Sequence, residues 1–183
     1  MIPYEMATDQ DCGPRALRAM TEETWEKIRD NWPGGWIDSG FGKIGFPNDT
    51  PYDHFGLLEA IGRKYRILTV GMIRDGACFA NKTAILIHFP DPGTAPRGLF
   101  SWLWRLLFPL MHQHWVILKE VRSDRVSVWY GGTGPDQTKT WTWDEFIKLY
   151  AGGWPACAYE IDKGDGKLTR WQWFVAKTTG KFV

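Results

Sequence analysis

The chain has 183 residues, of which 44% are hydrophobic, and a formal net charge of +1 at pH 7. This length suits one globular domain, residues 1–183, that buries a core without disulfides or structural metals. So small a net charge creates no long-range field that would collect nucleic acid or acidic lipid, and we expect no nucleic-acid partner.

The cysteine count and the amino terminus bear on the cellular compartment. Cys12, Cys78 and Cys157 form an odd, widely spaced set without a CxxC motif, which argues against a secreted disulfide framework. The first ten residues, MIPYEMATDQ, lack the basic head and apolar run of a signal peptide. We therefore expect a cytoplasmic protein in a reducing compartment.

Two helices are predicted near the amino terminus. Residues 12–20 carry apolar side chains on one helical face, and Thr21 predicts the start of a second helix with Glu22 and Glu23 in its first turn. The glycine-rich stretch 34–46 that follows is typical of a long loop at a rim.

A third helix is predicted over residues 50–62. Thr50 is its cap, Pro51 lies in its first turn, Asp53 completes a capping box and Gly62 ends it. This combination of start and stop signals gives the clearest helix prediction on the chain.

The second half of the chain is rich in strand-forming residues. Strands are predicted over 64–70, 83–89 and 114–121, with a hairpin across 114–130 and a second one pairing 157–162 with 168–176. Between the two hairpins, Thr142 and Glu145 form the capping box of a short helix. Helices first and sheet afterwards predict an α+β domain, with N-terminal helices packed on a C-terminal antiparallel sheet.

Residues 98–111, GLFSWLWRLLFPLM, form the most apolar stretch, within a predicted insertion or lid at about 93–112. Arg105 interrupts the stretch, which is too short to span a bilayer. Three interpretations stay open: a core or lid helix, a partner-docking helix, and an interfacial membrane contact.

Cys12, in the segment DQDCGPRAL, is the candidate nucleophile. A helix start favours the thiolate through its free backbone N–H groups, Gly13 leaves space beside the sulfur, and Pro14 suits a first helical turn. The alternative is a small buried hydrophobic residue, which is what most free cysteines are.

A thiolate nucleophile needs an imidazole partner to share and move the proton. His114 opens an apolar strand, from which its ring could reach a helix packed on the sheet, and His112 is the alternative base. His54 is predicted to be solvated, and His88 to be a satisfied core or edge residue.

Taken in order, DCGPRAL, the middle helix, HWVIL with its hairpin, and WTWDEFIKLYAGGW resemble the papain-fold cysteine peptidases, especially the bacteriocin-leader peptidases and their bacterial and phage relatives. The resemblance covers roughly residues 4–161. It implies a papain-like fold with Cys12 as nucleophile and His114 as general base.

Two positions depart from the family pattern. Met6 stands where the family carries a glutamine that helps to form the oxyanion hole, and Gln10 is the nearest substitute. Tyr130 occupies the slot of the acid that orients the imidazole, with Asp136 the nearest acid downstream. Asp11 and Asp53 are further candidates for that orienting role.

The leading hypothesis is therefore a cysteine peptidase that cleaves a peptide or isopeptide bond of a protein or peptide substrate. The alternatives are a catalytically impaired papain-fold binding or inhibitor module, and a cell-wall peptide amidohydrolase. We expect no cofactor and no metal, because pairs such as Asp53 with His54 and Asp91 with His88 lack further ligands at usual spacings.

Overall fold

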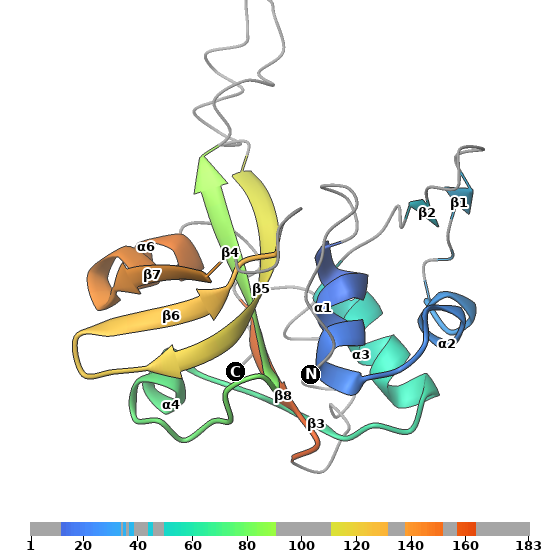
Figure 1. The fold of residues 1–183 in the computed structure, drawn as a ribbon, viewed down its shortest axis with the longest axis horizontal. Coiled ribbons are helices and arrows are strands. Elements are labelled where there is room, and N and C mark those ends of the chain that lie inside the picture. The colour runs from blue at the N-terminus through green and yellow to red at the C-terminus, as the bar shows by residue number, and fades with distance from the viewer. Residues whose placement is uncertain are drawn as a thin grey trace, which may run out of the picture.

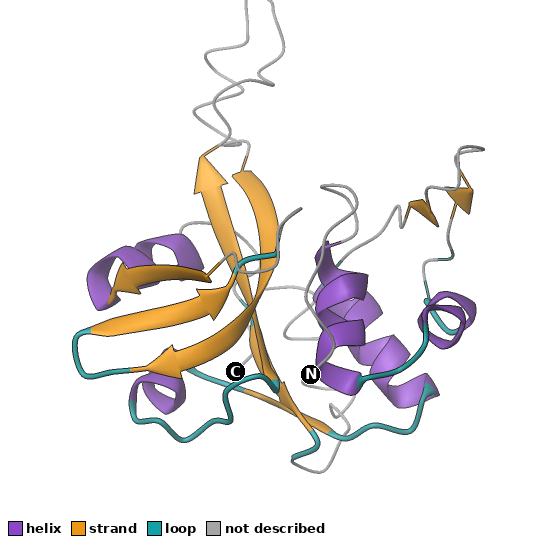
Figure 2. Ribbon diagram, viewed as in Figure 1, coloured by secondary structure: helices purple, strands orange, loops and turns teal. Residues whose placement is uncertain are grey.

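The protein has helices on both faces of a central antiparallel sheet, as Figure 1 shows for the computed structural model. The structure describes residues 12–33, 35, 37–38, 44–45, 50–90, 111–131, 138–151 and 157–163. Helices α1 and α3 cover one face of the sheet, and α6 lies on the other (Figure 2). The mixed α+β class expected from the sequence is confirmed at this coarse level.

The described elements follow one another as α1 (Cys12–Thr21), α2 (Trp25–Asp30), β1 (Ile37–Asp38), β2 (Ile44–Gly45), α3 (Pro51–Ala60), β3 (Tyr65–Ile67), α4 (Val70–Arg74), β4 (Thr83–Pro90), β5 (Met111–Val121), β6 (Arg125–Trp129), β7 (Thr138–Thr142), α6 (Trp143–Ala151) and β8 (Ala158–Ile161). Strands β1 and β2 pair with each other in a two-stranded sheet, within the stretch expected to be a loop.

The main sheet has the strand order β3-β8-β4-β5-β6-β7, and its neighbouring strands are all antiparallel. The predicted β5–β6 hairpin is confirmed, with Ile117 opposite Trp129 and an irregularity between Leu118 and Glu120. Strand β5 begins at Met111, so the last two residues of the expected insertion, 111 and 112, belong to the sheet. The rest of the expected insertion, 93–110, lies outside the described residues.

Two hydrophobic clusters hold the layers together, one on each face of the sheet. The α1-side cluster joins α1 and α3 to the sheet through buried residues that include Cys12, Leu17, Phe55, Trp115, Ile117 and Tyr159. The α6-side cluster joins α4 and α6 to it through Ile73, Ile85, Val116, Leu118, Val128 and Phe146, among others. The alternation of side chains along β5 explains why successive residues belong to different clusters.

Local signals explain most helix boundaries. The Asp53 carboxylate accepts hydrogen bonds from the Thr50 backbone N–H at 3.0 Å and from its hydroxyl at 2.6 Å, and Gly62 follows the helix at φ +73°. The predicted Thr142–Glu145 box is also present, with the Thr142 N–H donating to Glu145 Oε2 at 2.9 Å. These two predictions are confirmed.

The predicted start of the second helix was wrong. Thr21 is the last residue of α1, and Thr24 caps α2 by accepting from the Lys27 N–H at 3.3 Å. The Thr21 hydroxyl instead donates back to the Leu17 carbonyl at 2.7 Å, which a threonine can do inside a helix.

Two strand predictions also need correction. The strand expected over 64–70 ends at Ile67, because Thr69 caps the short helix α4 by accepting from the Met72 N–H. The hairpin expected between 157–162 and 168–176 is excluded, since β8 is already paired with β3 on one edge and β4 on the other. Residues 168–176 themselves lie outside the described residues.

Candidate active site

Cys12 is the first residue of α1, and its side chain is only 4% exposed. Ala16 and Leu17, on the next turn, are fully buried and fix this end of the helix against the sheet. The expected placement of Cys12 at a helix start is confirmed, which puts its sulfur near the positive end of the helix dipole.

The opposite end of α1 is anchored by two cations, which lie shortly before β3 and β4. Arg63 donates to the Thr21 carbonyl at 2.8 Å, and Lys82 donates to the Met20 carbonyl at 2.8 Å. Asp162 pairs with both cations, at 3.0 Å and 3.2 Å. Helix α1 is thus tied to the residue before β4 and, through the two cations, to the residue after β8, and these contacts fix the direction of the helix axis.

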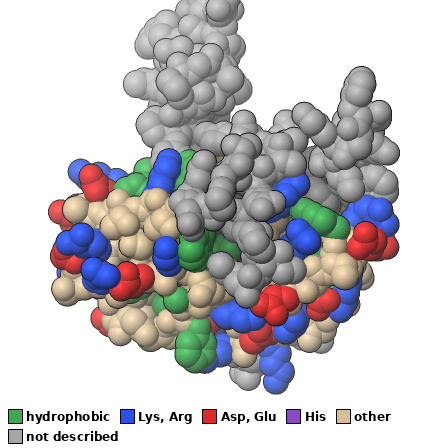
Figure 3. Space-filling model, viewed as in Figure 1, with side chains coloured by type: hydrophobic (Ala, Val, Ile, Leu, Met, Phe, Trp, Pro, Cys, Tyr) green, Lys and Arg blue, Asp and Glu red, His purple; other side chains and the backbone are tan. Residues whose placement is uncertain are grey.

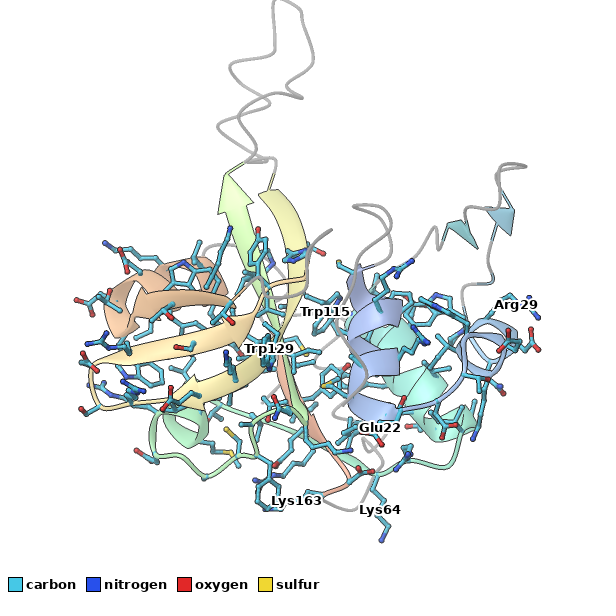
Figure 4. All side chains as sticks on the ribbon, in the orientation of Figure 1. Glu22, Arg29, Lys64, Trp115, Trp129 and Lys163 are labelled. Atoms are coloured by element: carbon cyan, nitrogen blue, oxygen red, sulfur yellow. The ribbon has the colours of Figure 1, made fainter. Side chains whose placement is uncertain are left out.

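Helix α1 packs directly on β5, the strand that carries His114. Trp115, next to His114, belongs to the same buried cluster as Cys12, and Figure 4 shows it between β5 and α1. The structure therefore brings together the two elements that carry the predicted nucleophile and the predicted base.

His114 is 3% exposed, and its ring is held by the main chain of Tyr130. Its Nε2 lies 2.5 Å from the Tyr130 carbonyl oxygen, and the two rings are in contact with centroids 4.4 Å apart. Because a carbonyl oxygen can only accept, Nε2 donates in this contact and carries a proton. In the neutral ring, Nδ1 is then the basic nitrogen.

Cys12 belongs to the α1-side cluster, whereas Tyr130, whose ring contacts His114, packs against the α6-side cluster. Alternation along β5 puts His114 on the same side as Val116 and Leu118, which belong to the α6-side cluster. The β5–β6 pairing ends at Ile117 and Trp129, so His114 lies beyond the last pair, where β6 no longer flanks β5.

His54 was expected to be solvated, and this expectation was wrong. The side chain is fully buried, its ring is stacked on Trp115 with centroids 4.0 Å apart, and its Nδ1 lies 2.6 Å from the Tyr159 hydroxyl. The sequence contained the signal, because Leu57 and Leu58 follow His54 at the i+3 and i+4 spacing of one helical face. The imidazole of His54 therefore contacts two members of the α1-side cluster, Trp115 and Tyr159.

His88 is buried in β4, as a core position requires, but it is not satisfied as expected. Neither ring nitrogen has a hydrogen-bond partner of good geometry. Burial lowers the pKa of His88, and the nearby main-chain carbonyls of Leu149 and Tyr150 act in the opposite direction. His112 belongs to β5, but its side chain lies outside the described residues.

The other two thiols lie in environments that disfavour the thiolate. Cys157 is fully buried, and burial raises its pKa well above the ordinary value. Cys78 is half-buried, and burial also raises its pKa, with the Thr83 side chain opposing this effect. The three cysteines are therefore chemically distinct, and only Cys12 begins a long helix.

The structure describes only some of the residues predicted to form the oxyanion hole or to orient the imidazole. Gln10, Asp11 and Asp136 lie outside the described residues, as does Met6. The Asp53 carboxylate is hydrogen-bonded to Thr50 in the cap of α3. Tyr130 does reach His114, but the hydrogen bond comes from its main-chain carbonyl.

Several broader properties of the described residues bear on ligand class. On the face in Figure 3, Lys and Arg intermingle with Asp and Glu over the described surface. Within the described ranges no group of three His, Cys, Asp or Glu residues could hold a metal ion. No helix there is long and apolar enough to cross a membrane.

The chain matches no protein-family model and no curated protein sequence.

Proposed function

We propose that the protein is a thiol hydrolase of papain-like fold that cleaves a peptide or isopeptide bond. Cys12 acts as the nucleophile, and His114 acts as general base and then general acid. One observation carries the proposal: a cysteine opens a helix that packs on the strand bearing a buried, hydrogen-bonded histidine.

The proposed reaction has two steps. His114 takes the Cys12 proton, the sulfur attacks the substrate carbonyl carbon, and the imidazolium returns that proton to the leaving amine as the C–N bond breaks. Water, deprotonated by the same imidazole, then cleaves the thioester, releasing the carboxylic acid and the free thiol. The Cys12 backbone N–H, at the start of α1, supports the oxyanion, and Gln10 is the second candidate donor.

The decisive experiment compares the purified full chain with variants in a pool of fluorescence-quenched peptides. Cys12→Ala and His114→Ala should each abolish cleavage while thermal melting changes little. Cys78→Ala is the matched thiol control and should keep full turnover. Equal turnover in the parent protein and Cys12→Ala would end the proposal.

A second candidate, a binding module of the same fold without catalysis, is favoured by a specific observation. Cys12 and His114 are both almost fully buried, at 4% and 3% exposed, and this burial restricts the access of a substrate to either side chain. This candidate predicts no cleavage of any peptide in the pool, together with slow alkylation of Cys12 in the folded protein.

A further inference from the structure

In a thiol hydrolase an acidic side chain is expected to orient the imidazole of His114, but the expected position carries no acid. Tyr130 occupies that position, and a phenol cannot supply a carboxylate. The structure nevertheless gives the imidazole a short hydrogen bond, from Nε2 to the Tyr130 carbonyl oxygen at 2.5 Å. The acceptor is part of the main chain, so its direction is set by the backbone and not by the tyrosine side chain.

The backbone direction at this point depends on Gly131. Tyr130 comes one residue after Trp129, the last residue of β6 to pair with β5, and Gly131 has φ +76° and is buried. A residue with a Cβ rarely adopts such a φ. The glycine therefore permits a left-handed backbone immediately after the carbonyl that accepts from His114.

Contacts of the Tyr130 side chain also hold the backbone segment that contains Tyr130 and Gly131. Its ring lies against the His114 ring, and the Lys139 ammonium lies 3.6 Å from the ring centroid. Trp141 adds an edge-on contact with centroids 6.3 Å apart. These contacts, from two residues of β7, hold Tyr130 in place without supplying the hydrogen bond itself.

We propose that Gly131 is a positioning residue: its left-handed backbone aims the Tyr130 carbonyl at His114 Nε2, and this carbonyl takes the orienting role usually given to a carboxylate. The consequence for catalysis rests on the proposed function. The bond keeps the proton on Nε2, so that Nδ1 is the nitrogen available to exchange a proton with a thiol.

The first test needs no substrate. Nitrogen-15 NMR of the histidine rings should show neutral His114 in the Nε2–H tautomer, assigned by loss of the signal in His114→Gln. In Gly131→Ala the Nδ1–H tautomer should gain population, because a Cβ disfavours the φ that aims the carbonyl. Tyr130→Phe retains the carbonyl and should retain the Nε2–H tautomer.

The second test uses cleavage activity. Gly131→Ala should lower kcat by roughly 10- to 100-fold with little change in KM, as expected for losing one hydrogen bond to a charged ring. Gly62→Ala is the matched control: Gly62 also has positive φ, +73°, with open space around an added Cβ, and lies outside the site. It should keep both kcat and the tautomer signal.

The outcomes separate the positioning inference from the proposed function. A major Nδ1–H tautomer in the parent protein overturns the inference, as does a Gly131→Ala protein with unchanged tautomer and kcat. If Gly131→Ala does not fold, Gly131→Asn is measured, since Asn tolerates a left-handed backbone: it should preserve the Nε2–H tautomer, and loss of that tautomer in the folded variant overturns the inference. Tautomer results as expected in a protein without cleavage activity would support the inference and contradict the hydrolase.

Discussion

The imidazole of His54 lies stacked on the indole of Trp115, with ring centroids 4.0 Å apart and planes inclined by 27°. This contact joins α3 to the strand that carries His114, and it is reinforced by the hydrogen bond between His54 and the Tyr159 hydroxyl of β8. Three elements distant in sequence thus meet at one buried histidine.

We expect His54→Ala to lower the free energy of unfolding by about 2–4 kcal/mol, since it removes a buried ring and leaves a cavity beside Trp115. Tyr159→Phe keeps the packing but removes the hydroxyl, and should cost about 1–3 kcal/mol. Urea unfolding followed by tryptophan fluorescence measures both. A loss for His54→Ala no larger than that for Tyr159→Phe would contradict the packing role.

The thiols are expected to react with iodoacetamide in a defined order. At pH 7.5, Cys12 should be alkylated first, because it begins α1, whereas burial raises the pKa of Cys157 and Cys78. Mass spectrometry of timed digests gives the three rates. In urea, where these environments are lost, the three rates should converge; slow labelling of all three in the folded protein would favour the binding module.

Predictability from sequence differed between local and long-range features. The caps at Thr50 and Thr142 were predictable because each depends on side chains three residues apart. The pairing of β8 was not, since nothing local indicates that residues near the end of the described chain insert between β3 and β4. Short α4 was missed because β-branched residues before it favoured a longer strand.

The candidate site shows the same division. A cysteine at a helix start and a histidine in an apolar strand could be identified from residue type and spacing. The Tyr130 carbonyl could not, because every residue carries a carbonyl and only the fold determines which one faces His114.

The ion pair between Arg66 and the buried Glu160 should contribute strongly to the free energy of unfolding. The Glu160 side chain is fully buried, Arg66 pairs with its Oε2 at 2.7 Å, and the Phe79 N–H donates to its Oε1 at 2.6 Å. We expect Arg66→Ala to cost about 3 kcal/mol, because it leaves a buried carboxylate without its cation. Arg125→Ala, which breaks an exposed pair with Asp124, is the matched control and should change the urea midpoint little. Equal effects of the two variants would refute this prediction.

His88 should make stability depend on pH below neutrality. Burial lowers its pKa below the ordinary 6.5, so the unfolded ring takes up a proton more readily than the folded one. The contribution of neutral His88 to the free energy of unfolding is therefore complete above pH 6.5. It is lost as the pH falls from 6.5 towards the lower pKa of the folded state. Urea unfolding at pH 5.5 and 7.5 should show a smaller pH effect for His88→Leu than for the parent protein. An identical pH effect in both proteins would exclude His88 as the cause.

The position of β8 has a consequence for how the chain acquires its fold during synthesis. Because β8 separates β3 from β4, the sheet stays split until residues 158–161 have left the ribosome. The nascent chain can form α1, α3 and the β4–β5–β6 meander early, but with the β4 edge unpaired. Many native contacts then join residues far apart in sequence, a topology associated with slow folding. A ribosome stalled before β8 would hold an exposed strand edge, the kind of surface that chaperones of nascent chains protect.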